Sequence, residues 1–174
     1  MSAYGVIHLN KDKTLMKFVV ISLAISSFSL LLVMFGDYNG NAFNKVIAVL
    51  TGVLFWGFLI IGYVILGIIS GHRKTYERKN RADLGRKANR DANKRPGIIC
   101  FFSNQKAIIA DIVMIVSFII NLIFMFIPSV NQVVAVIFIA IFAFAVHMHC
   151  VLNGVNFRYI AHISKNDVSK ESRV

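Results

Sequence analysis

The chain has 174 residues, of which 57% are hydrophobic, and it carries a formal net charge of +11. This hydrophobic fraction is well above the roughly 45–50% of ordinary soluble domains, and four long apolar runs account for it. The runs leave no room for a separate soluble domain. We therefore expect residues 1–174 to form a single all-α transmembrane domain, with four helices arranged as two hairpins.

The first apolar run, Phe18–Phe35, follows three lysines and is long enough to span a membrane as a helix. A signal peptide also begins this way, but its apolar core is usually shorter, and no A-x-A-like cleavage site follows here. We therefore expect a retained first span. Its serines Ser22, Ser26 and Ser29 lie three or four residues apart, which predicts a face that packs closely on another helix.

The second run, Val46–Ile69, contains glycines that are spaced five residues apart. They are Gly52, Gly57, Gly62 and Gly67, and Gly71 follows one turn later. At 100° per residue, all of them except Gly62 fall within one broad arc of the helix. Because small residues let helices approach each other in lipid, we expect Gly52, Gly67 and Gly71 to mark a helix-packing face.

Residues 70–106 form a basic connector between the hairpins. Its candidate lipid- or partner-binding residues are Arg73, Lys74, Arg78, Lys79, Arg81, Arg86, Lys87, Arg90, Lys94 and Arg95. Basic clusters beside a span commonly meet anionic headgroups, so we expect this connector to contact anionic lipid or a protein partner. The alternative is that it mainly sets the orientation of the chain and is otherwise solvated. Nucleic acid is not an expected partner, because only Tyr76 offers an aromatic platform among these charges.

The connector is also rich in helix formers, so the second helix can continue beyond the membrane before Pro96-Gly97 stops it. The short apolar stretch that follows contains Ile98, Ile99, Phe101 and Phe102. It is too short to span a membrane, which predicts a segment lying along the inner leaflet.

The third run, Ala107–Ile127, contains Asp111, the only acid within a span. An ionised Asp deep in a span costs about 2.5–3.5 kcal/mol on insertion scales, and such groups usually face protein or water. Asn121 lies deeper in the same run. It is a candidate for binding an ion or a substrate, with an interhelical hydrogen bond as the alternative.

The fourth run, Val133–Leu152, ends in the sequence HMHC. A row of small and polar residues at alternating spacings of three and four comprises Ala140, Ala143, His147, Cys150 and Gly154. We expect this row to face the bundle, with Ala140, Ala143 and Gly154 as helix-packing positions. His149 falls on the other side of the helix, beside Phe142, and is expected to point towards lipid or headgroups.

Asp111 and His147 lie at nearly the same depth on neighbouring antiparallel helices, so we expect them to meet across the second hairpin. One interpretation is a titratable pair coupled to proton or cation movement. The other is a structural hydrogen bond, or two polar residues that reach the headgroups. Zinc bound by Asp111, His147 and Cys150 is chemically conceivable, but no fourth ligand is in reach. We therefore expect no metal and no cofactor.

Basic residues alternate between the segments that flank the spans. Lys11, Lys13 and Lys17 precede the first span, Lys45 is alone in the next loop, and Pro128–Gln132 has none. The basic connector and the C-terminal tail, which holds Arg158, Lys165, Lys170 and Arg173, lie on the same side as the N-terminal segment. The positive-inside rule then places both termini and the connector in the cytoplasm.

The two hairpins resemble each other in sequence. Asn44–Leu50 and Asn131–Ile137 are similar starts, and the second and fourth spans both end at small polar pairs, Ser70-Gly71 and Asn153-Gly154. A duplicated hairpin would give a parallel repeat of the kind found in some transporters. The alternative is chance similarity between apolar segments of restricted composition.

Function is less constrained than topology. The spans lack HExxH, GxSxG, CxxC and Walker motifs, so we expect no enzyme. The leading hypothesis is an accessory or scaffold subunit that contacts anionic lipid, other membrane-protein subunits or a second copy of itself. The alternative is a small oligomeric transporter or channel, with Asp111, His147 and Asn121 as its transport or proton-linked residues.

Overall fold

The computed structural model describes residues 3–35, 42–79, 101–102, 105, 107–127, 129–157 and 159–160. All regular elements in these ranges are helical. They are α1 (Ala3–Ser29), the 3-10 helix η1 (Leu30–Phe35), α2 (Ala42–Lys79), α4 (Ile108–Met125) and α5 (Gln132–Leu152). Residues 80–100, which include most of the predicted basic connector, lie outside the described part.

Four segments are long and apolar enough to cross a membrane: Lys11–Phe35, Asn44–Tyr76, Ile108–Met125 and Gln132–Leu152. The prediction of an all-α protein with four such helices is thereby confirmed. Helix α1 begins well before its predicted span, and α2 continues beyond its own span to Lys79, as its helix-forming residues predict. At 1.5 Å per residue α2 is about 57 Å long, roughly twice the thickness of a hydrocarbon core.

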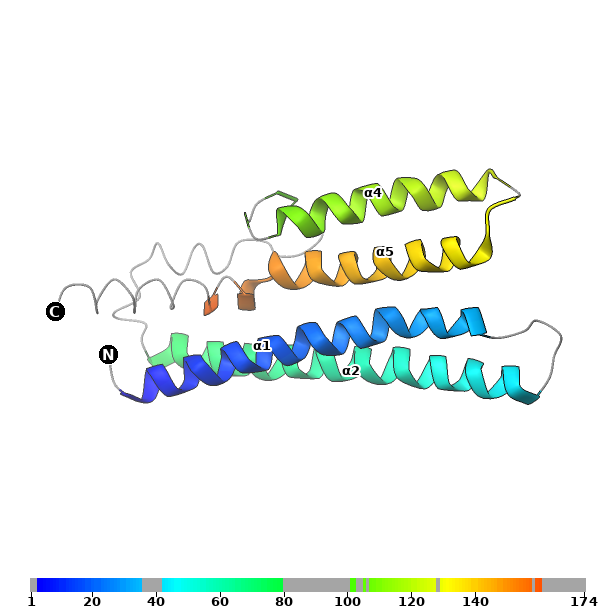
Figure 1. The fold of residues 1–174 in the computed structure, drawn as a ribbon. Helices are drawn as coiled ribbons and strands as arrows, with labels where there is room; N and C mark the ends of the chain where they lie inside the picture. Colours follow the sequence, from blue (N-terminus) through cyan, green and yellow to red (C-terminus); the bar gives the residue numbers. More distant parts are fainter. Residues whose placement is uncertain are drawn as a thin grey trace.

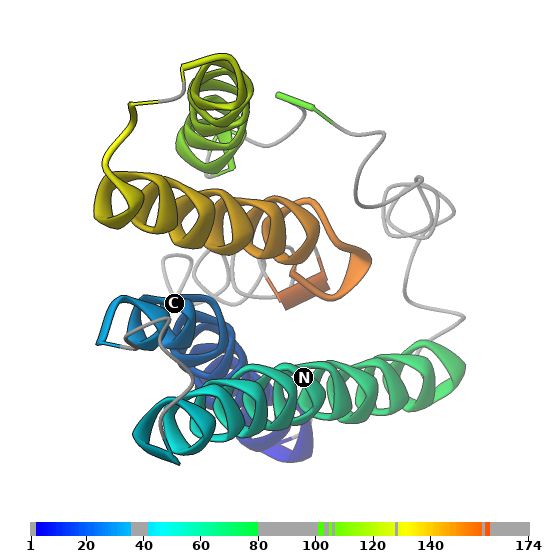
Figure 2. The ribbon, with the colours of Figure 1, turned by 90° about the vertical axis from the view of Figure 1, so that its right-hand side faces the viewer.

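The helices form two antiparallel hairpins that lie side by side (Figure 1). Helix α1 packs against both α2 and α5, and among the described helices α4 contacts only α5. Viewed along a perpendicular direction, α4 is separated from the first hairpin by α5 (Figure 2). α5 therefore has two packed faces, one on α4 and one on the first hairpin.

The helices of the first hairpin approach each other closely at Gly62. A Cβ atom on this glycine would lie 3.0 Å from Cδ2 of Leu23 and 3.6 Å from Cβ of Ser22. One turn along α1, the hydroxyl of Ser26 donates a 2.7 Å hydrogen bond to the carbonyl oxygen of Phe55 on α2. Ser22, Ser26 and Ser29 are all buried, so the small face of α1 meets protein.

The packing face of α2 is not the one that the sequence predicts. A Cβ at Gly52, Gly67 or Gly71 would meet nothing within 4 Å, so these glycines do not mark a helix contact within the described chain. The contact is made by Gly62, the one glycine outside their arc. Periodicity correctly separates Gly62 from the others, but it does not say which of the two faces meets α1.

Bulky side chains set the register of the second hairpin. The rings of Phe118 and Phe142 lie 5.7 Å apart, and those of Phe124 and Phe138 lie 5.6 Å apart. These pairs fix which residues of α4 and α5 face each other along the whole hairpin. On the other side of α5, Ala140 is fully buried, as the predicted packing row requires.

The buried apolar core lies where α1, α2 and α5 meet. Its members are Met16, Val19, Leu23, Ile69, Met148, Val151, Tyr159 and Ile160. Ala143 is half-buried beside this region. Gly154 follows α5, and a Cβ there would lie 2.9 Å from the carbonyl oxygen of Cys150. This glycine therefore serves the turn that ends α5 and not a helix-helix contact.

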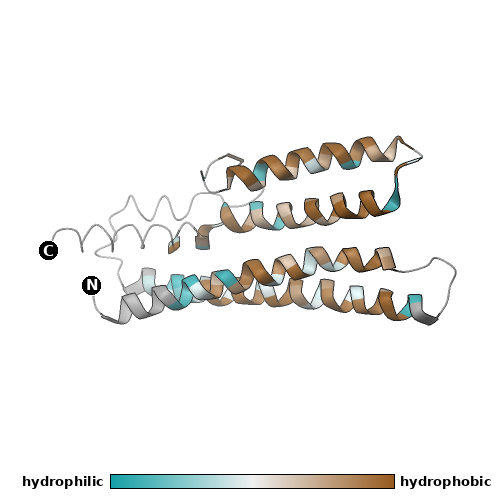
Figure 3. Ribbon diagram, in the orientation of Figure 1, coloured by the Kyte–Doolittle hydropathy of each residue, from teal (hydrophilic) through white to brown (hydrophobic). Residues whose placement is uncertain are grey.

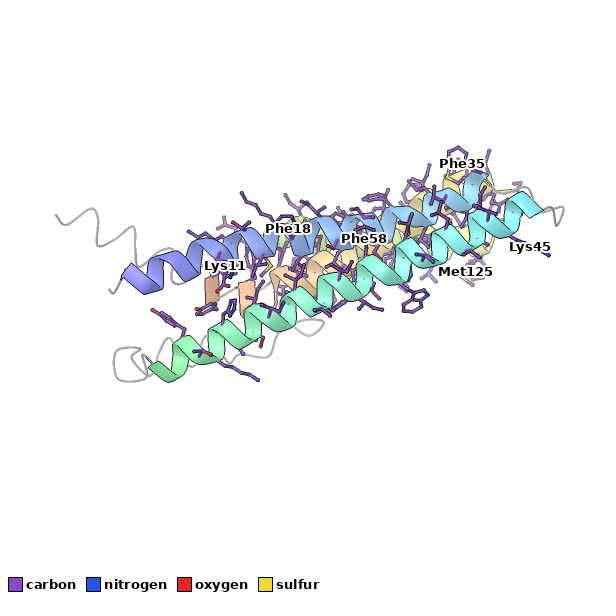
Figure 4. The ribbon with its side chains drawn as sticks, turned by 90° about the horizontal axis from the view of Figure 1, so that it is seen from below. Lys11, Phe18, Phe35, Lys45, Phe58 and Met125 are labelled. Atoms are coloured by element: carbon purple, nitrogen blue, oxygen red, sulfur yellow. The ribbon has the colours of Figure 1, made fainter. Side chains whose placement is uncertain are left out.

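Hydrophilic residues of the first hairpin gather at the end where α1 begins and α2 ends (Figure 3). Lys11 lies towards this end and Lys45 at the opposite end (Figure 4). We call the first of these the basic end, because it carries Lys11, Lys13, Lys17, Arg73 and Lys74. The open ends of both hairpins lie on this side of the molecule (Figure 1).

Candidate functional site

Asp111 lies in the first turn of α4 and is 0% exposed. A carboxylate is favoured at this place because the first backbone N–H groups of a helix have no intrahelical partner and give the N-terminus a partial positive charge. No side chain caps the helix at Ala107. Asp111 thus supplies the negative charge in the first turn of α4.

Both oxygens of Asp111 accept hydrogen bonds. Oδ1 accepts from Nδ1 of His149 at 2.6 Å and from Nδ2 of Asn153 at 3.3 Å. Oδ2 accepts from the backbone N–H of Phe102 at 2.7 Å. Three donors thus converge on one carboxylate, two from the end of α5 and one from the segment before α4, as a buried anion requires.

The ring of Phe101 completes this arrangement, with its centroid 4.6 Å from that of His149. Phe102 has a φ of 52°, in the left-handed region that a bulky residue rarely adopts, and its N–H is held by Asp111. We call Phe101, Phe102, Asp111, His149 and Asn153 the Asp111 cluster. It ties the segment before α4 and the end of α5 to the start of α4.

The prediction that His149 faces lipid is wrong. The side chain of His149 is 1% exposed and bonded to Asp111. The register explains this. Moving seven residues, about two turns, from Phe118 leads to Asp111, and moving seven residues from Phe142 leads to His149. The face of α5 that carries Phe142 and His149 therefore packs on α4.

His147 does not meet Asp111. It lies on the other packed side of α5, where its Nδ1 is 3.3 Å from the hydroxyl of Tyr63 on α2. The two rings are in an edge-to-face arrangement with centroids 6.1 Å apart. The predicted Asp111–His147 pair is thus replaced by two separate contacts, one for each residue, because α5 lies between α4 and the first hairpin.

Asn121 links the two helices of the second hairpin. Its Nδ2 donates to the carbonyl oxygen of Ser117 at 2.8 Å and to that of Phe138 on α5 at 3.3 Å. This is the interhelical hydrogen bond that was the alternative to ion or substrate binding. Asp111, His147 and Asn121 consequently occupy three different places, and the structure does not bring them together.

A second Asp–His pair joins the helices of the first hairpin. Oδ1 of Asp12 on α1 lies 2.7 Å from Nδ1 of His72 on α2; Asp12 is 1% exposed, whereas the His72 side chain is 30% exposed. Oδ2 of Asp12 is buried and accepts no hydrogen bond from the described residues. The sequence analysis missed this pair because both residues flank the apolar runs. A usable signal was present, since an acid just before one span and a His just after the next lie at the same end of an antiparallel hairpin.

No group of three or more His, Cys, Asp or Glu side chains that could hold a metal ion occurs within the described ranges. The conceivable zinc set of Asp111, His147 and Cys150 is not assembled, since Asp111 is bonded to His149 on the other side of α5. In this part of the chain, the polar groups are arranged to join helices.

The predicted lipid- or partner-binding residues are only partly described. Lys74 is exposed and Arg73 is half-buried, both near the C-terminal end of α2. Arg78 and Lys79 are in the last turn of that helix. Arg81, Arg86, Lys87, Arg90, Lys94 and Arg95 lie outside the described residues. Of the predicted leaflet segment, Phe101 and Phe102 are described, and both are exposed.

The sequence and the fold were both compared with those of known proteins. Comparisons with models of protein families, with curated proteins and with solved structures find no match.

Proposed function

We propose that this chain is a non-enzymatic accessory or scaffold subunit of a membrane, whose basic end contacts anionic lipid or a protein partner. The observation that carries the proposal is the state of Asp111. This acid of the third span is fully buried, and both its oxygens are bonded within the chain. A group that moves protons or cations needs access to water, whereas a group that joins helices does not.

The basic end supplies a surface for contact. Lys11, Lys17 and Lys74 are exposed there, and the ten Lys and Arg of segment 73–95 continue from the same end of α2. We place this end in the cytoplasm by the positive-inside rule. Each Lys or Arg near an anionic leaflet contributes about 1 kcal/mol to the attraction, so the end as a whole would hold anionic lipid firmly.

The transport alternative has less support. Its three candidate residues do not converge. Two of them form hydrogen bonds between α4 and α5: Asp111 bonds to His149, and Asn121 bonds to the carbonyl oxygen of Phe138. A flux assay separates the two functions. In proteoliposomes with an internal pH indicator, we expect no protein-dependent proton flux. A flux that Asp111→Asn abolishes would support transport and contradict the scaffold proposal.

The main test of the proposal is the composition of the complex that the protein forms. The tagged chain is extracted gently into nanodiscs, captured, and weighed by native mass spectrometry. We expect masses above that of one chain, from a membrane-protein partner or further copies. A single chain without a protein partner, at every expression level, would contradict the proposed accessory role.

The lipid contact is tested with matched charge variants. Lys11→Gln, Lys17→Gln and Lys74→Gln together remove exposed charge from the basic end, and Lys45→Gln removes one charge from the opposite end (Figure 4). In nanodiscs of phosphatidylcholine mixed with phosphatidylglycerol, we expect the triple variant to retain fewer phosphatidylglycerol molecules. The Lys45 variant should retain as many as the unaltered chain. Equal retention by all three would remove the lipid part of the proposal.

A further inference from the structure

The contact between Tyr63 and His147 lies apart from the Asp111 cluster and plays no part in the proposed scaffold function. It connects α2 to α5, two helices that both pack on α1. His147 is five residues before the end of α5, which puts it about 7.5 Å inside that end. The pair therefore lies at the level where the polar parts of membrane lipids meet the acyl chains.

The pair is accessible and not enclosed by protein. Tyr63 is 46% exposed, and His147 and Cys150 are half-buried. Cys150 is one turn after His147 on the same face of α5. The three side chains form a polar patch on a surface that is otherwise apolar.

The hydrogen-bonding capacity of this pair is not used up. If the Tyr63 hydroxyl donates to Nδ1 of His147, the Nε2–H of the imidazole is left over. If Nδ1–H donates instead, the Tyr63 O–H is left over. Either way one donor has no acceptor among the described residues. The spare donor is thus open to an acceptor on a molecule that is dissolved in the membrane at this level.

A second hydrogen bond lies next to the pair. One turn further along α2, the carbonyl oxygen of Leu66 accepts a 3.1 Å hydrogen bond from Nδ2 of Asn156, which follows α5. This bond joins α2 to the segment after α5 without using the spare donor of the Tyr63–His147 pair. The donor is therefore accessible and uncommitted, as a binding group would be.

We propose that Tyr63 and His147 form a binding site for a membrane-dissolved molecule with an apolar body and a carbonyl or hydroxyl head. The head accepts the spare hydrogen bond, and the apolar body lies along α2 and α5. Quinones and sterols share this chemistry, since a sterol offers its one hydroxyl and a quinone offers one of its two ring carbonyls at an end of an apolar body. Cys150 lies beside the head and lines the site without bonding to it.

The test uses photoactivatable analogues of a quinone and of a sterol, each added separately to the full chain in phosphatidylcholine nanodiscs. We expect at least one analogue to label peptides of α2 or α5, and an excess of the unlabelled molecule to compete. Which analogue does so identifies the source of the head group. Absence of competable labelling with both would overturn the proposal.

Substitutions then assign the label to the pair. Tyr63→Phe combined with His147→Phe keeps two rings but removes the donor, and we expect binding about tenfold weaker, equivalent to one hydrogen bond of about 1.4 kcal/mol. Tyr76→Phe is the matched control, because it makes the same change on the same helix where Tyr76 stacks on Tyr159. It should bind as the unaltered chain does.

Unchanged binding by the double variant would also overturn the proposal. If the double variant does not fold, a second double variant decides. Here Tyr63→Phe is combined with His147→Leu instead, which also removes both possible donors but introduces a smaller side chain, and binding should again be about tenfold weaker. A folded variant of this second kind with unchanged affinity for both analogues would contradict the site.

Discussion

The two hairpins are closed by different means. In the first, α1 and α2 approach each other at Gly62, and the Asp12–His72 pair at the basic end has a half-exposed histidine. In the second, phenylalanine rings lie between α4 and α5, and Asp111 is buried among the groups that donate hydrogen bonds to it. The first hairpin relies on close contact between helices, and the second relies on polar bonds.

This difference matters because lipid gives little hydrophobic drive to bring helices together. Helix α1 contacts two neighbours, but within the described chain α4 contacts only α5. The attachment of α4 therefore depends on its contacts with α5, among which the bond between Asp111 and His149 is fully buried. We infer that loss of Asp111 affects the second hairpin more than loss of Asp12 affects the first.

The largest effect is expected for Asp111→Ala. It leaves the buried His149 and Asn153 side chains without the carboxylate that they contact, and breaking a buried pair in this way costs about 3–5 kcal/mol. The free energy of unfolding, measured by titrating the protein in mixed micelles with SDS, should fall by that amount. A loss below that of Asp12→Ala would reverse the comparison between the hairpins.

The next effect concerns the close approach in the first hairpin. Gly62→Val places extra methyl groups against Leu23, which is fully buried and has little room to move, at a cost of about 1–3 kcal/mol. Gly67→Val is the matched control on the same helix, with open space around it, and should change stability by less than ~0.5 kcal/mol. The same unfolding titration measures both. Equal losses would place the contact elsewhere on α2.

Asp12→Ala should have a smaller effect than Asp111→Ala and one comparable to that of Gly62→Val. It removes a hydrogen bond to a charged group, worth about 1.5–3 kcal/mol, and the exposure of His72 to solvent favours the lower end of this range. Because His72 can then be solvated, we expect the variant to remain folded at a reduced melting temperature. A loss of stability as large as that of Asp111→Ala would show that the Asp12–His72 pair is as protected from solvent as the Asp111–His149 pair.

The smallest effect is expected for Asn121→Leu. The hydrogen bond to the carbonyl oxygen of Phe138 is the polar link between α4 and α5 in the middle of the hairpin, and interhelical hydrogen bonds in membranes contribute about 0.6 kcal/mol on average. Unfolding should change by about that amount. A gain in stability would indicate that Asn121 is kept for binding an ion or substrate.

The number and kind of helices could be predicted from the sequence, because span length and apolarity depend on local composition alone. The importance of Asp111 could also be predicted, since an acid in a span needs partners. Its partner could not. Periodicity shows which residues share a face of α5, and it placed His149 beside Phe142. It does not show that this face meets α4 while the face of His147 meets the first hairpin.

Gly62 illustrates the same limit, because its separation from the other glycines was correct and the face assigned to the contact was wrong. Hairpin duplication stays a prediction. Both hairpins have an Asp on the first helix and a His on the second, at the same end. However, His72 lies ten residues further from Asn44 than His149 lies from Asn131, so the two pairs do not align on the similar helix starts.

The most direct test of the central claim, that Asp111 closes the second hairpin through His149, is a pair of double-mutant cycles. Asp111→Ala is combined with His149→Ala in one cycle and with His147→Ala in the other, and the free energy of unfolding is measured for all variants. We predict a coupling of about 1.5–3 kcal/mol between Asp111 and His149, and less than ~0.5 kcal/mol between Asp111 and His147. Strong coupling to His147, or none to His149, would contradict this account.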